Sequence, residues 1–513
     1  MISAPENLFS VENLYGAYLK CRKGKRGKIN TRGFEVNLVK NLNYLSYHLQ
    51  NRTYEPSRSV LFYVSKPKFR EIFAADFGDR VVHRLLVDAL EPEFDKKFIS
   101  DSFACRRDKG THSAVDRLRE FLDSLTNFGK WEGYYLQLDI RGFFMEIQKD
   151  ILNEILRKKV DEKLLWLSGK ILYNNPINNY ILKGKPVRQG ILPPHKTLFH
   201  PNPKKGIPIG NLTSQFFANV YLNHLDQFCK RRLGITYYLR YVDDFILLDS
   251  SRERLLDWRE KIITYLREEL DLQLKDSNKD PISVYKGIDF LGYFCKPSHT
   301  LVRRRVIKNF KTALAESLPP RGYNTDLFQI TKYHKSLEEW KTLQSRVNSY
   351  MGHSCHSNSY SLGNHIKKLL FPYRAFIDFH NGYIRLKPNM YYKYSNFKSQ
   401  ISFYKKEFPN YTLIIKKGRF YEIIGKDAED LAKLNRLKPY YRKGQVQYGF
   451  RTNRIRKILY SMKAHYMSGV LIRETEEITN KIKARIPVYS WKLQRAVQLE
   501  LFKTEERIRN EKK

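Results

Sequence analysis

The chain has 513 residues, of which 42% are hydrophobic and 14% aromatic, so it can bury large cores and wholesale disorder is excluded. Lysine and arginine number 93 against 53 aspartate and glutamate, a formal net charge of +40. This excess argues against an enzyme of neutral substrates with an average surface. It favours a polyanionic partner, nucleic acid ahead of an anionic membrane.

Three further features narrow the class of protein. No run of about 18 apolar residues occurs, so no transmembrane helix and no membrane partner are expected. The first residues lack a basic segment followed by an apolar one, which argues against secretion. The cysteines are scattered, odd in number and form no CxxC pair, which favours a reducing cytoplasm over a disulfide framework: Cys21, Cys105, Cys229, Cys295 and Cys355.

Taken in chain order, the first 300 residues predict alternating strands and helices. Val60 to Phe73 is strand-like, with an interruption at Lys66-Pro67-Lys68. Apolar residues at helical spacing predict a helix from Ser113 to Leu125. Further elements are a buried strand over Tyr135 to Ile140, a buried helix over Ser214 to Leu233, two strands within Tyr237 to Leu248, and a short strand at Phe290 to Tyr293.

The sequence pattern changes in the rest of the chain. Residues 303–370 are basic and predicted to be helical, and a second αβ unit begins between Phe371 and Pro388. In this unit we expect strands over Tyr411 to Ile415 and Phe420 to Ile424. A helix over Asp427 to Leu434 and more helix after Arg451 should follow.

The adjacent carboxylates Asp243 and Asp244 are the sharpest feature of the sequence. They interrupt an apolar stretch, between Tyr241-Val242 and Phe245-Ile246-Leu247-Leu248. Because a buried carboxylate must be paired or bound to a metal, these flanks favour a cation site over a solvated turn. Asp139 ends another predicted buried strand. Three such carboxylates can hold two Mg²⁺ ions about 4 Å apart, and Mg²⁺ suits a site without His or Cys.

Short motifs in these segments resemble those of reverse transcriptases. Tyr241-Val242-Asp243-Asp244 resembles the YxDD box, and Leu138-Asp139-Ile140-Arg141-Gly142-Phe143-Phe144 resembles the first palm motif. Three more follow the family order: Lys66-Pro67-Lys68-Phe69-Arg70 of the fingers strand, Asp79-Arg80-Val81-Val82-His83 of the fingers helix, and Phe290-Leu291-Gly292-Tyr293 of the primer grip. The resemblance spans about residues 1–370. It implies an RNA-directed DNA polymerase that uses two Mg²⁺ ions, with Mn²⁺ as a substitute.

The resemblance also implies the fold, an α+β right-hand polymerase. Its parts would be fingers with an N-terminal extension (1–120), a palm (121–285) with a fingers insertion at about 150–208, and a primer grip and thumb (286–372). A small α/β domain (380–513) follows. A cytoplasmic protein encoded by a bacterium, an archaeon or a phage is expected.

Roles for single residues follow from the same resemblance. Asp139, Asp243 and Asp244 would be catalytic and bind the metals, with the backbone carbonyl of Ile140 as a further ligand. Residues expected at the incoming deoxynucleotide are Lys66, Arg70, Phe144, Ile209 and Gln215. Lys66 and Arg70 would contact the triphosphate. Phe144 would be a gate against a ribose 2′-hydroxyl, unless it is a core aromatic. Lys275 or Lys279 would protonate the pyrophosphate, and Phe290, Leu291, Gly292 and Tyr293 would hold the primer.

The segment Gly206 to Gln215 narrows the subclass. Most reverse transcriptases have QGxxxSP here, whereas this chain has Ile209 for the Gln and Gln215 for the Pro. This form resembles the enzymes of diversity-generating retroelements, which copy a template RNA with errors mostly at adenines. The neighbouring segments Ala104 to His112, Phe217 to Asn223 and Met351 to His353 also resemble that family. An antiphage-defence reverse transcriptase is the alternative, and a catalytically silent RNA-binding scaffold is a third hypothesis that the intact carboxylates disfavour.

Residues 400–476 resemble the mismatch-recognition domain of MutS proteins. Gly418-Arg419-Phe420-Tyr421-Glu422 matches its GxFYE box, although Arg419 stands where that family has Asp before FYE. The resemblance implies that Phe420 wedges beside a mispaired base and Glu422 bonds to it. The alternative makes Phe420 a core residue of a general nucleic-acid or partner-binding module. Expected partners of the whole chain are template RNA, cDNA or an RNA–DNA hybrid, dNTPs, and an accessory protein or a second copy.

Overall fold

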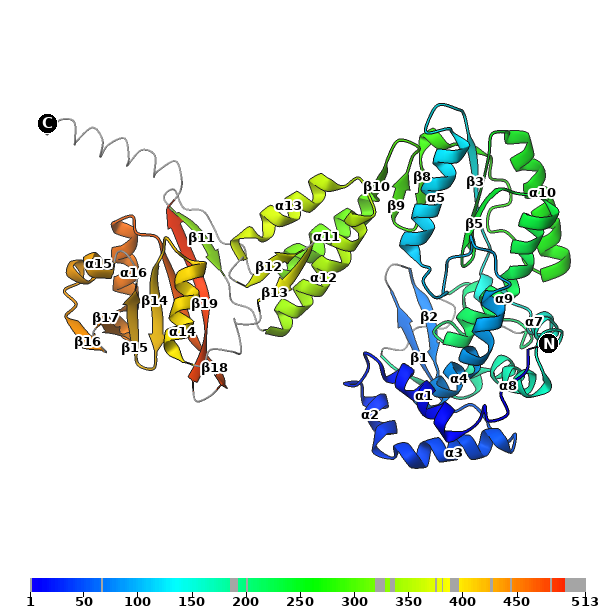
Figure 1. Ribbon diagram of the computed structural model, residues 1–513, viewed down its shortest axis with the longest axis horizontal. Coiled ribbons are helices and arrows are strands. Elements are labelled where there is room, and N and C mark those ends of the chain that lie inside the picture. The colour runs from blue at the N-terminus through cyan, green and yellow to red at the C-terminus, as the bar shows by residue number, and fades with distance from the viewer. Residues whose placement is uncertain are drawn as a thin grey trace. The chain divides into compact units, whose positions relative to one another are not determined.

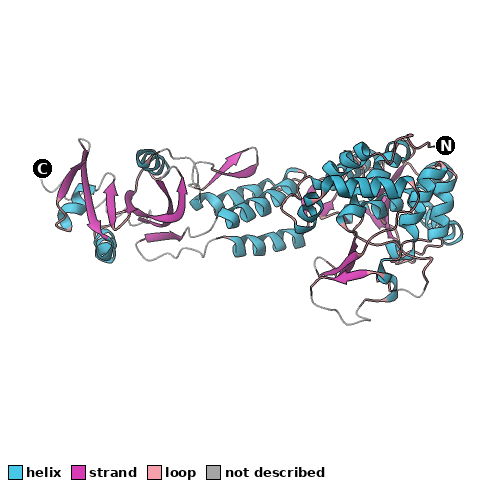
Figure 2. Cartoon of the chain, turned by 90° about the horizontal axis from the view of Figure 1, so that it is seen from below, coloured by secondary structure: helices cyan, strands magenta, loops and turns pink. Residues whose placement is uncertain are grey.

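The computed structural model describes residues 2–65, 68–184, 192–199, 202–318, 328–332, 337–373, 376–380, 382–387, 396–424, 428–442, 445–479 and 482–493. The chain divides into two compact units, Met1–Thr300 and Leu301–Lys513, called here the N-terminal and C-terminal units. Figure 1 labels their elements, and Figure 2 shows a mainly helical N-terminal unit and a C-terminal end rich in strands. This mixture of helix and sheet agrees with the expected α+β class. Among the described residues, no helix is long and apolar enough to cross a membrane.

The N-terminal unit begins with three helices that pack against a fourth, and a small sheet belongs to the same unit. Helix α4 (Phe77–Asp95) starts at Asp76, whose carboxylate accepts a hydrogen bond from the Gly78 amide. The stretch predicted as an interrupted strand is a hairpin of β1 and β2, and β4 pairs with β1 in parallel. The bounds are α1 (Val11–Arg22), α2 (Ile29–Val36), α3 (Leu38–Gln50), β1 (Ser59–Val64), β2 (Arg70–Ala74) and β4 (Tyr180–Leu182).

A four-stranded antiparallel sheet of order β5-β6-β3-β7 lies at the centre of this unit. Alternate residues of β3 and β6, Leu136 and Leu138 with Phe245 and Leu247, join the large core that also contains α9 and α10. Because side chains alternate across a strand, the residues between them face the other side of the sheet. The bounds are β3 (Tyr134–Asp139), β5 (Tyr237–Tyr241), β6 (Asp244–Asp249), β7 (Ile282–Ser283), α5 (Thr111–Leu125), α9 (Leu212–Gln227) and α10 (Arg252–Leu270).

Two predicted elements differ from the elements in the structure. The buried helix predicted to Leu233 is α9 followed by a π-helical turn over Phe228–Arg232. The strand predicted at Phe290 to Tyr293 is wrong, because these residues form the tip of a hairpin. Leu291 and Gly292 both have positive φ, 49° and 93°, as a two-residue type I′ turn requires. The remaining bounds are α6 (Phe143–Glu146), α7 (Lys149–Arg157), α8 (Glu162–Tyr173), β8 (Ile288–Phe290), β9 (Tyr293–Cys295) and β10 (Thr300–Val302).

The C-terminal unit combines long helices with one large sheet. Its helical part consists of α11 (Arg304–Ser317), α12 (Leu337–Cys355), α13 (Tyr360–Leu370) and the hairpin of β12 (Ile377–His380) and β13 (Tyr383–Leu386). Buried residues of these helices, such as Trp340 and Leu370, belong to one core together with Tyr404, Leu413 and Ile472. The helical part and the sheet therefore share apolar packing.

The sheet of this unit has the order β11-β19-β18-β14-β15-β17-β16. Among the described strands of this sheet, only β14 and β18 pair in parallel. The predicted strands at Tyr411 and Phe420 are β14 and β15. The bounds are β11 (Phe328–Lys332), α14 (Phe397–Glu407), β14 (Thr412–Lys417), β15 (Phe420–Ile424), α15 (Ala428–Leu434), β16 (Pro439–Arg442), β17 (Gln445–Arg451), α16 (Ile455–Ala464), β18 (Gly469–Thr479) and β19 (Ile482–Leu493).

Candidate active site

The central sheet brings Asp139 and Asp244 together from positions far apart in the sequence. Strands β3 and β6 pair antiparallel, and Asp139 lies directly opposite Asp244. Side chains of directly opposed residues project from the same face with Cβ atoms about 5 Å apart. This face is the one opposite Leu138 and Phe245, so the two carboxylates point away from the large core.

Asp243 lies in the tight turn that connects β5 to β6. The turn consists of Val242 and Asp243, and Val242 has a φ of 59°. A β-branched residue in the left-handed region is a backbone outlier and costs about 1–3 kcal/mol. The Ile140 amide donates a hydrogen bond of 3.3 Å to the Asp243 carbonyl, which ties the turn to the end of β3. All three predicted acids therefore lie at one end of the sheet.

The carboxylates of Asp243 and Asp244 are in an environment that opposes their ionisation. Burial, followed by the negative charge of Asp139, raises the pKa of Asp243 to about 6. Burial also raises the pKa of Asp244 to about 6, against a hydrogen bond from Gln137 that lowers it. Negative charge is thus concentrated at this end of the sheet, and neighbouring carboxylates that repel one another are the electrostatic setting in which a divalent cation binds.

The oxygen donors of the three acids are of the type that magnesium ions prefer. They are carboxylate oxygens, and Asp139 keeps a side-chain exposure of 34%. Hard oxygen donors with space for water are what Mg²⁺ prefers. Within the described ranges, no three His, Cys, Asp or Glu side chains are arranged as a site for a metal ion. Ile140 has its amide bonded to Asp243 and its side chain buried, and the role of its carbonyl stays a prediction.

Three polar side chains surround the carboxylates. The Gln137 amide donates to both carboxylate oxygens of Asp244 at 3.0 Å, a role that the sequence interpretation missed. Its signal was its position, two residues before Asp139 on the same face of β3. Lys275 Nζ lies 3.6 Å from Asp139 Oδ2, and Lys279 Nζ donates to the Gln137 carbonyl at 3.1 Å. Both lysines considered as proton donors are therefore beside the carboxylates.

Arg70, one of the two positive groups predicted for the triphosphate, lies on the hairpin of β1 and β2. Arg70 is exposed at the start of β2. Burial and the charge of Asp139 raise the pKa of Asp243, and the positive charges of Arg70 and Lys68 lower it to a smaller extent, so both cations are near enough to act on this carboxylate. Lys66 lies outside the described residues.

The segment from Gly206 to Asn211 connects this hairpin to the palm motif. The Ile207 amide donates to the Phe144 carbonyl at 2.8 Å, and the Phe73 amide donates to the Ile209 carbonyl at 3.1 Å. The Ile209 side chain packs against an apolar cluster that contains Phe73 and Met145. Phe144 is half-buried at the start of α6 and edge-on to Phe143, 5.4 Å between ring centroids. Gln215 is exposed in the first turn of α9, on the same connected segment.

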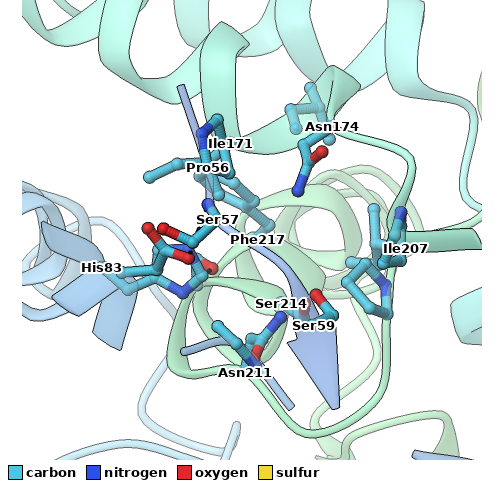
Figure 3. A pocket seen from close by; sticks show the side chains of 16 residues that line it. Pro56, Ser57, Ser59, His83, Ile171, Asn174, Ile207, Asn211, Ser214 and Phe217 are labelled. Atoms are coloured by element: carbon cyan, nitrogen blue, oxygen red, sulfur yellow. Dashed lines mark hydrogen bonds between the residues drawn. The ribbon is translucent and has the colours of Figure 1, made fainter. Parts of the chain in front are cut away.

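A small cavity lies beneath this segment, between α4, β1 and the start of α9 (Figure 3). Its lining includes His83, Asn211 and Ser214, but none of the three predicted acids. The Asn211 side chain accepts a hydrogen bond of 3.0 Å from the Ala75 amide, and Thr213 Oγ1 is 3.3 Å from His83 Nδ1. The cavity is therefore a support for the loop, distinct from the carboxylates.

The predicted primer grip is only partly available for contact. Phe290 and Tyr293 are buried, and the Tyr293 hydroxyl is 3.0 Å from His112 Nδ1. Leu291 and Gly292 form the tip of the hairpin and are partly exposed. A primer could contact the tip of the hairpin, and the two buried aromatic side chains hold this tip in place.

Phe420 and Glu422 occupy different environments in the C-terminal sheet. Phe420 begins β15 and is 49% exposed, so it is not a core residue. It is directly opposite Lys417 on one side and Arg451 on the other. Glu422 is buried, and its Oε1 accepts from Lys417 Nζ at 2.8 Å and from the Tyr440 hydroxyl at 3.0 Å. Its Oε2 has no hydrogen-bond partner among the described residues.

Comparison with known families agrees with this geometry. Residues 64–295 match the family described as reverse transcriptase (RNA-dependent DNA polymerase). The chain contains a reverse transcriptase domain. The matched range includes the three acids, strand β2 with Arg70, and the hairpin tip at Leu291. It supports RNA-directed DNA polymerase activity, and divalent metal ions are general cofactors of such enzymes.

Two curated relatives match parts of this chain. Protein YkfC of Escherichia coli (strain K12) is 23% identical over 314 residues, which cover 54% of this chain and 75% of YkfC. The group II intron-encoded protein LtrA of Lactococcus lactis subsp. cremoris is 26% identical over 185 residues, which cover 35% of this chain and 26% of LtrA.

Proposed function

We propose that this reverse transcriptase copies a template RNA into cDNA with frequent errors at template adenines, as an enzyme of a diversity-generating retroelement. The observation that carries this proposal is Ile209 together with Gln215 in place of the usual Gln and Pro. The hydrogen bonds of this segment to Phe144 and Phe73 support its place beside the incoming nucleotide.

The chemistry of Ile209 gives the proposal a physical basis. An amide in this position can form polar contacts that align a correctly paired nucleotide, whereas an aliphatic side chain cannot. The loss of one such hydrogen bond is worth about 1–3 kcal/mol. Discrimination between right and wrong nucleotides then falls, because specificity is the difference between their transition-state energies.

Sequencing of cDNA made on a defined RNA tests this proposal. Ile209→Gln should lower the error frequency opposite template adenine, while Ile209→Leu should keep the parental spectrum as an apolar control. An Ile209→Gln spectrum identical to that of the parent contradicts the role of Ile209. Parental accuracy equal at all four template bases contradicts the retroelement assignment and favours a defence enzyme with ordinary copying.

In the proposed active site, Asp139, Asp243 and Asp244 would hold two Mg²⁺ ions, with the Ile140 carbonyl as a further ligand. Bound Mg²⁺ supplies activation of the primer 3′-hydroxyl and stabilisation of the pyrophosphate. Lys66 and Arg70 would bind the triphosphate and orient it toward these carboxylates, with Lys68 of the same motif as a further cation. Phe144 excludes the 2′-hydroxyl of a ribonucleotide. Lys275 or Lys279 delivers a proton to the leaving pyrophosphate.

We further propose that one face of the C-terminal sheet binds an exposed or mispaired base. Phe420 stands on this face between the cations Lys417 and Arg451, a combination suited to stacking on a base and binding its phosphates. Glu422 is two residues along the same strand, and its unpartnered Oε2 would bond to the base edge when its pocket opens. The likeness to the MutS mismatch domain supports this role.

The whole chain is the right material for a test, because the apolar core continues between the helices and the sheet of this unit. Phe420→Ala should weaken binding to a mismatched duplex by about 5–150-fold, with little change for a perfect duplex. Tyr460→Ala, which removes another exposed aromatic of the same unit, is the control. An equal loss on both duplexes, or none, contradicts mismatch recognition.

A further inference from the structure

A fully buried ion pair lies directly behind the turn that carries Asp243. Arg240, the residue before Tyr241 in β5, and Asp226 of α9 have side-chain exposures of 1% and 0%. The guanidinium donates to both oxygens of this carboxylate at 2.7 Å, from Nε to Oδ1 and from Nη2 to Oδ2. Tyr238 completes the pair by donating to Asp226 Oδ1 at 2.7 Å.

The remaining donors of Arg240 reach outside the pair. Nη1 donates to the carbonyl of Val242 at 2.9 Å and to Asn219 Oδ1 at 3.3 Å. Nη2 donates to Ser102 Oγ at 3.0 Å. An arginine side chain has five N–H donors, and each has an acceptor here. The bond to Val242 is the one that touches the turn.

The hydrogen bond from Arg240 to the Val242 carbonyl supports a residue with an unfavourable backbone conformation. Val242 is a β-branched residue with positive φ, so the turn would relax toward a more ordinary conformation without support. Its carbonyl precedes Asp243 in the chain, and the same peptide plane sets the direction of the next residue. We propose that Arg240, locked by Asp226, is a positioning residue that holds the Val242 turn in the conformation that presents Asp243 and Asp244 to the metal ions.

Stability alone does not account for this pair. A buried ion pair is weak support for a fold, because the desolvation of both charges offsets most of their attraction. Apolar residues of similar volume often replace such a pair without loss of stability. Those residues cannot donate to the Val242 carbonyl. The effect of the ion pair on stability and its effect on the turn can therefore be separated by experiment. This inference rests on the proposed role of the carboxylates as metal ligands.

Two variants separate positioning from folding. The double variant Arg240→Met with Asp226→Leu removes both charges together, and Arg240→Lys keeps the charge but cannot form the fork that reaches Asp226 and Val242 at once. For both, we expect kcat for deoxynucleotide addition to fall about 5–150-fold, as expected for one lost buried hydrogen bond. KM for the nucleotide and the affinity for template–primer should change less than threefold, and both variants should keep a cooperative melting transition.

Tyr238→Phe is the matched control, because it removes a bond to the same Asp226 without touching the turn. Its kcat should stay within about threefold of the parent. Hydrogen exchange gives a readout independent of activity: amides of residues 241–246 should exchange faster in Arg240→Lys than in Tyr238→Phe.

The following results would overturn the positioning role. They are an unchanged kcat in Arg240→Lys, a kcat loss that is equal in Tyr238→Phe, or unaltered exchange over the turn. If both Arg240 variants lose their melting transition, the residue is structural and the inference is wrong. An Asp244→Asn variant run in parallel tests the proposed metal ligands separately from the positioning role of Arg240. Full activity in that variant would contradict the proposed metal ligands, whatever Arg240 does.

Discussion

Replacing Asp243 by asparagine should abolish polymerisation and, in the absence of metal, make the protein more stable. Asp243 has its pKa raised from 3.8 to about 6 by burial and by Asp139. A shift of about two units corresponds to about 3 kcal/mol of opposition to the charged form. Because the site is open at one side and the charges are coupled, we expect about 1–3 kcal/mol at pH 8, or a rise of about 2–6 °C in melting temperature.

The pH dependence of this effect has a definite sign. The carboxyl group binds a proton more tightly in the folded than in the unfolded protein. Its destabilising effect is therefore absent below about pH 4, grows between about pH 4 and 6, and is complete above about pH 6. The asparagine variant should match the parent at pH 4 and exceed it at pH 8. Mg²⁺ should reduce the difference in stability between the variant and the parent, because it binds the parent more tightly and stabilises it.

Thermal melts in EDTA and in Mg²⁺, between pH 4 and 8, measure these quantities. Asp257→Asn is the control, since Asp257 is exposed in the same unit and the change should stay within about 0.5 kcal/mol. Template–primer binding should survive in Asp243→Asn, because the chain keeps nearly all of its net charge of +40. An Asp243→Asn protein that is no more stable than the parent at pH 8, or a difference that does not vary with pH, would refute the electrostatic reasoning.

Two other substitutions probe the same site. Phe144→Ala should admit ribonucleotides, because the exclusion of the 2′-hydroxyl is steric; a competition assay with unchanged sugar selectivity would rule out the gate. Gln137→Leu removes the hydrogen bond from the Gln137 side-chain amide that lowers the pKa of Asp244. The acidic limb of the pH–rate profile should therefore move to higher pH. An unshifted pH profile of single-nucleotide addition would show that this hydrogen bond does not control the carboxylate.

Local pattern was sufficient to find the strands and the acids of the site. An apolar run on each side of Asp243-Asp244 predicts two strands and a turn, and the structure has β5, β6 and a two-residue turn there. The period of two along β3 then places Gln137 on the same face as Asp139. These features depend on neighbouring residues only, and a sequence displays them directly.

Features that depend on distant contacts were not visible in the sequence. Arg240 is 14 residues from Asp226, and only the packing of α9 against the sheet makes them partners. The one sign of such a pair was that Asp226 and Arg240 are the only Asp, Glu, Lys or Arg residues in α9 and β5. Burial of Glu422 likewise depends on Tyr440, which crosses over Gly449 on the neighbouring strand.

The turn at Leu291 shows a different limit. Leucine is rare at positive φ, so Phe-Leu-Gly-Tyr has the composition of a strand and only Gly292 indicates a turn. The surrounding hairpin imposes the backbone conformation on Leu291.

Primer extension on a defined RNA template tests the central claim most directly. The purified full-length chain, an annealed DNA primer, dNTPs and Mg²⁺ should yield cDNA of template length. Asp244→Asn should bind the same template–primer but extend nothing. Extension of the primer by Asp244→Asn at the parental rate, or no extension by the parent with either Mg²⁺ or Mn²⁺, would contradict the account.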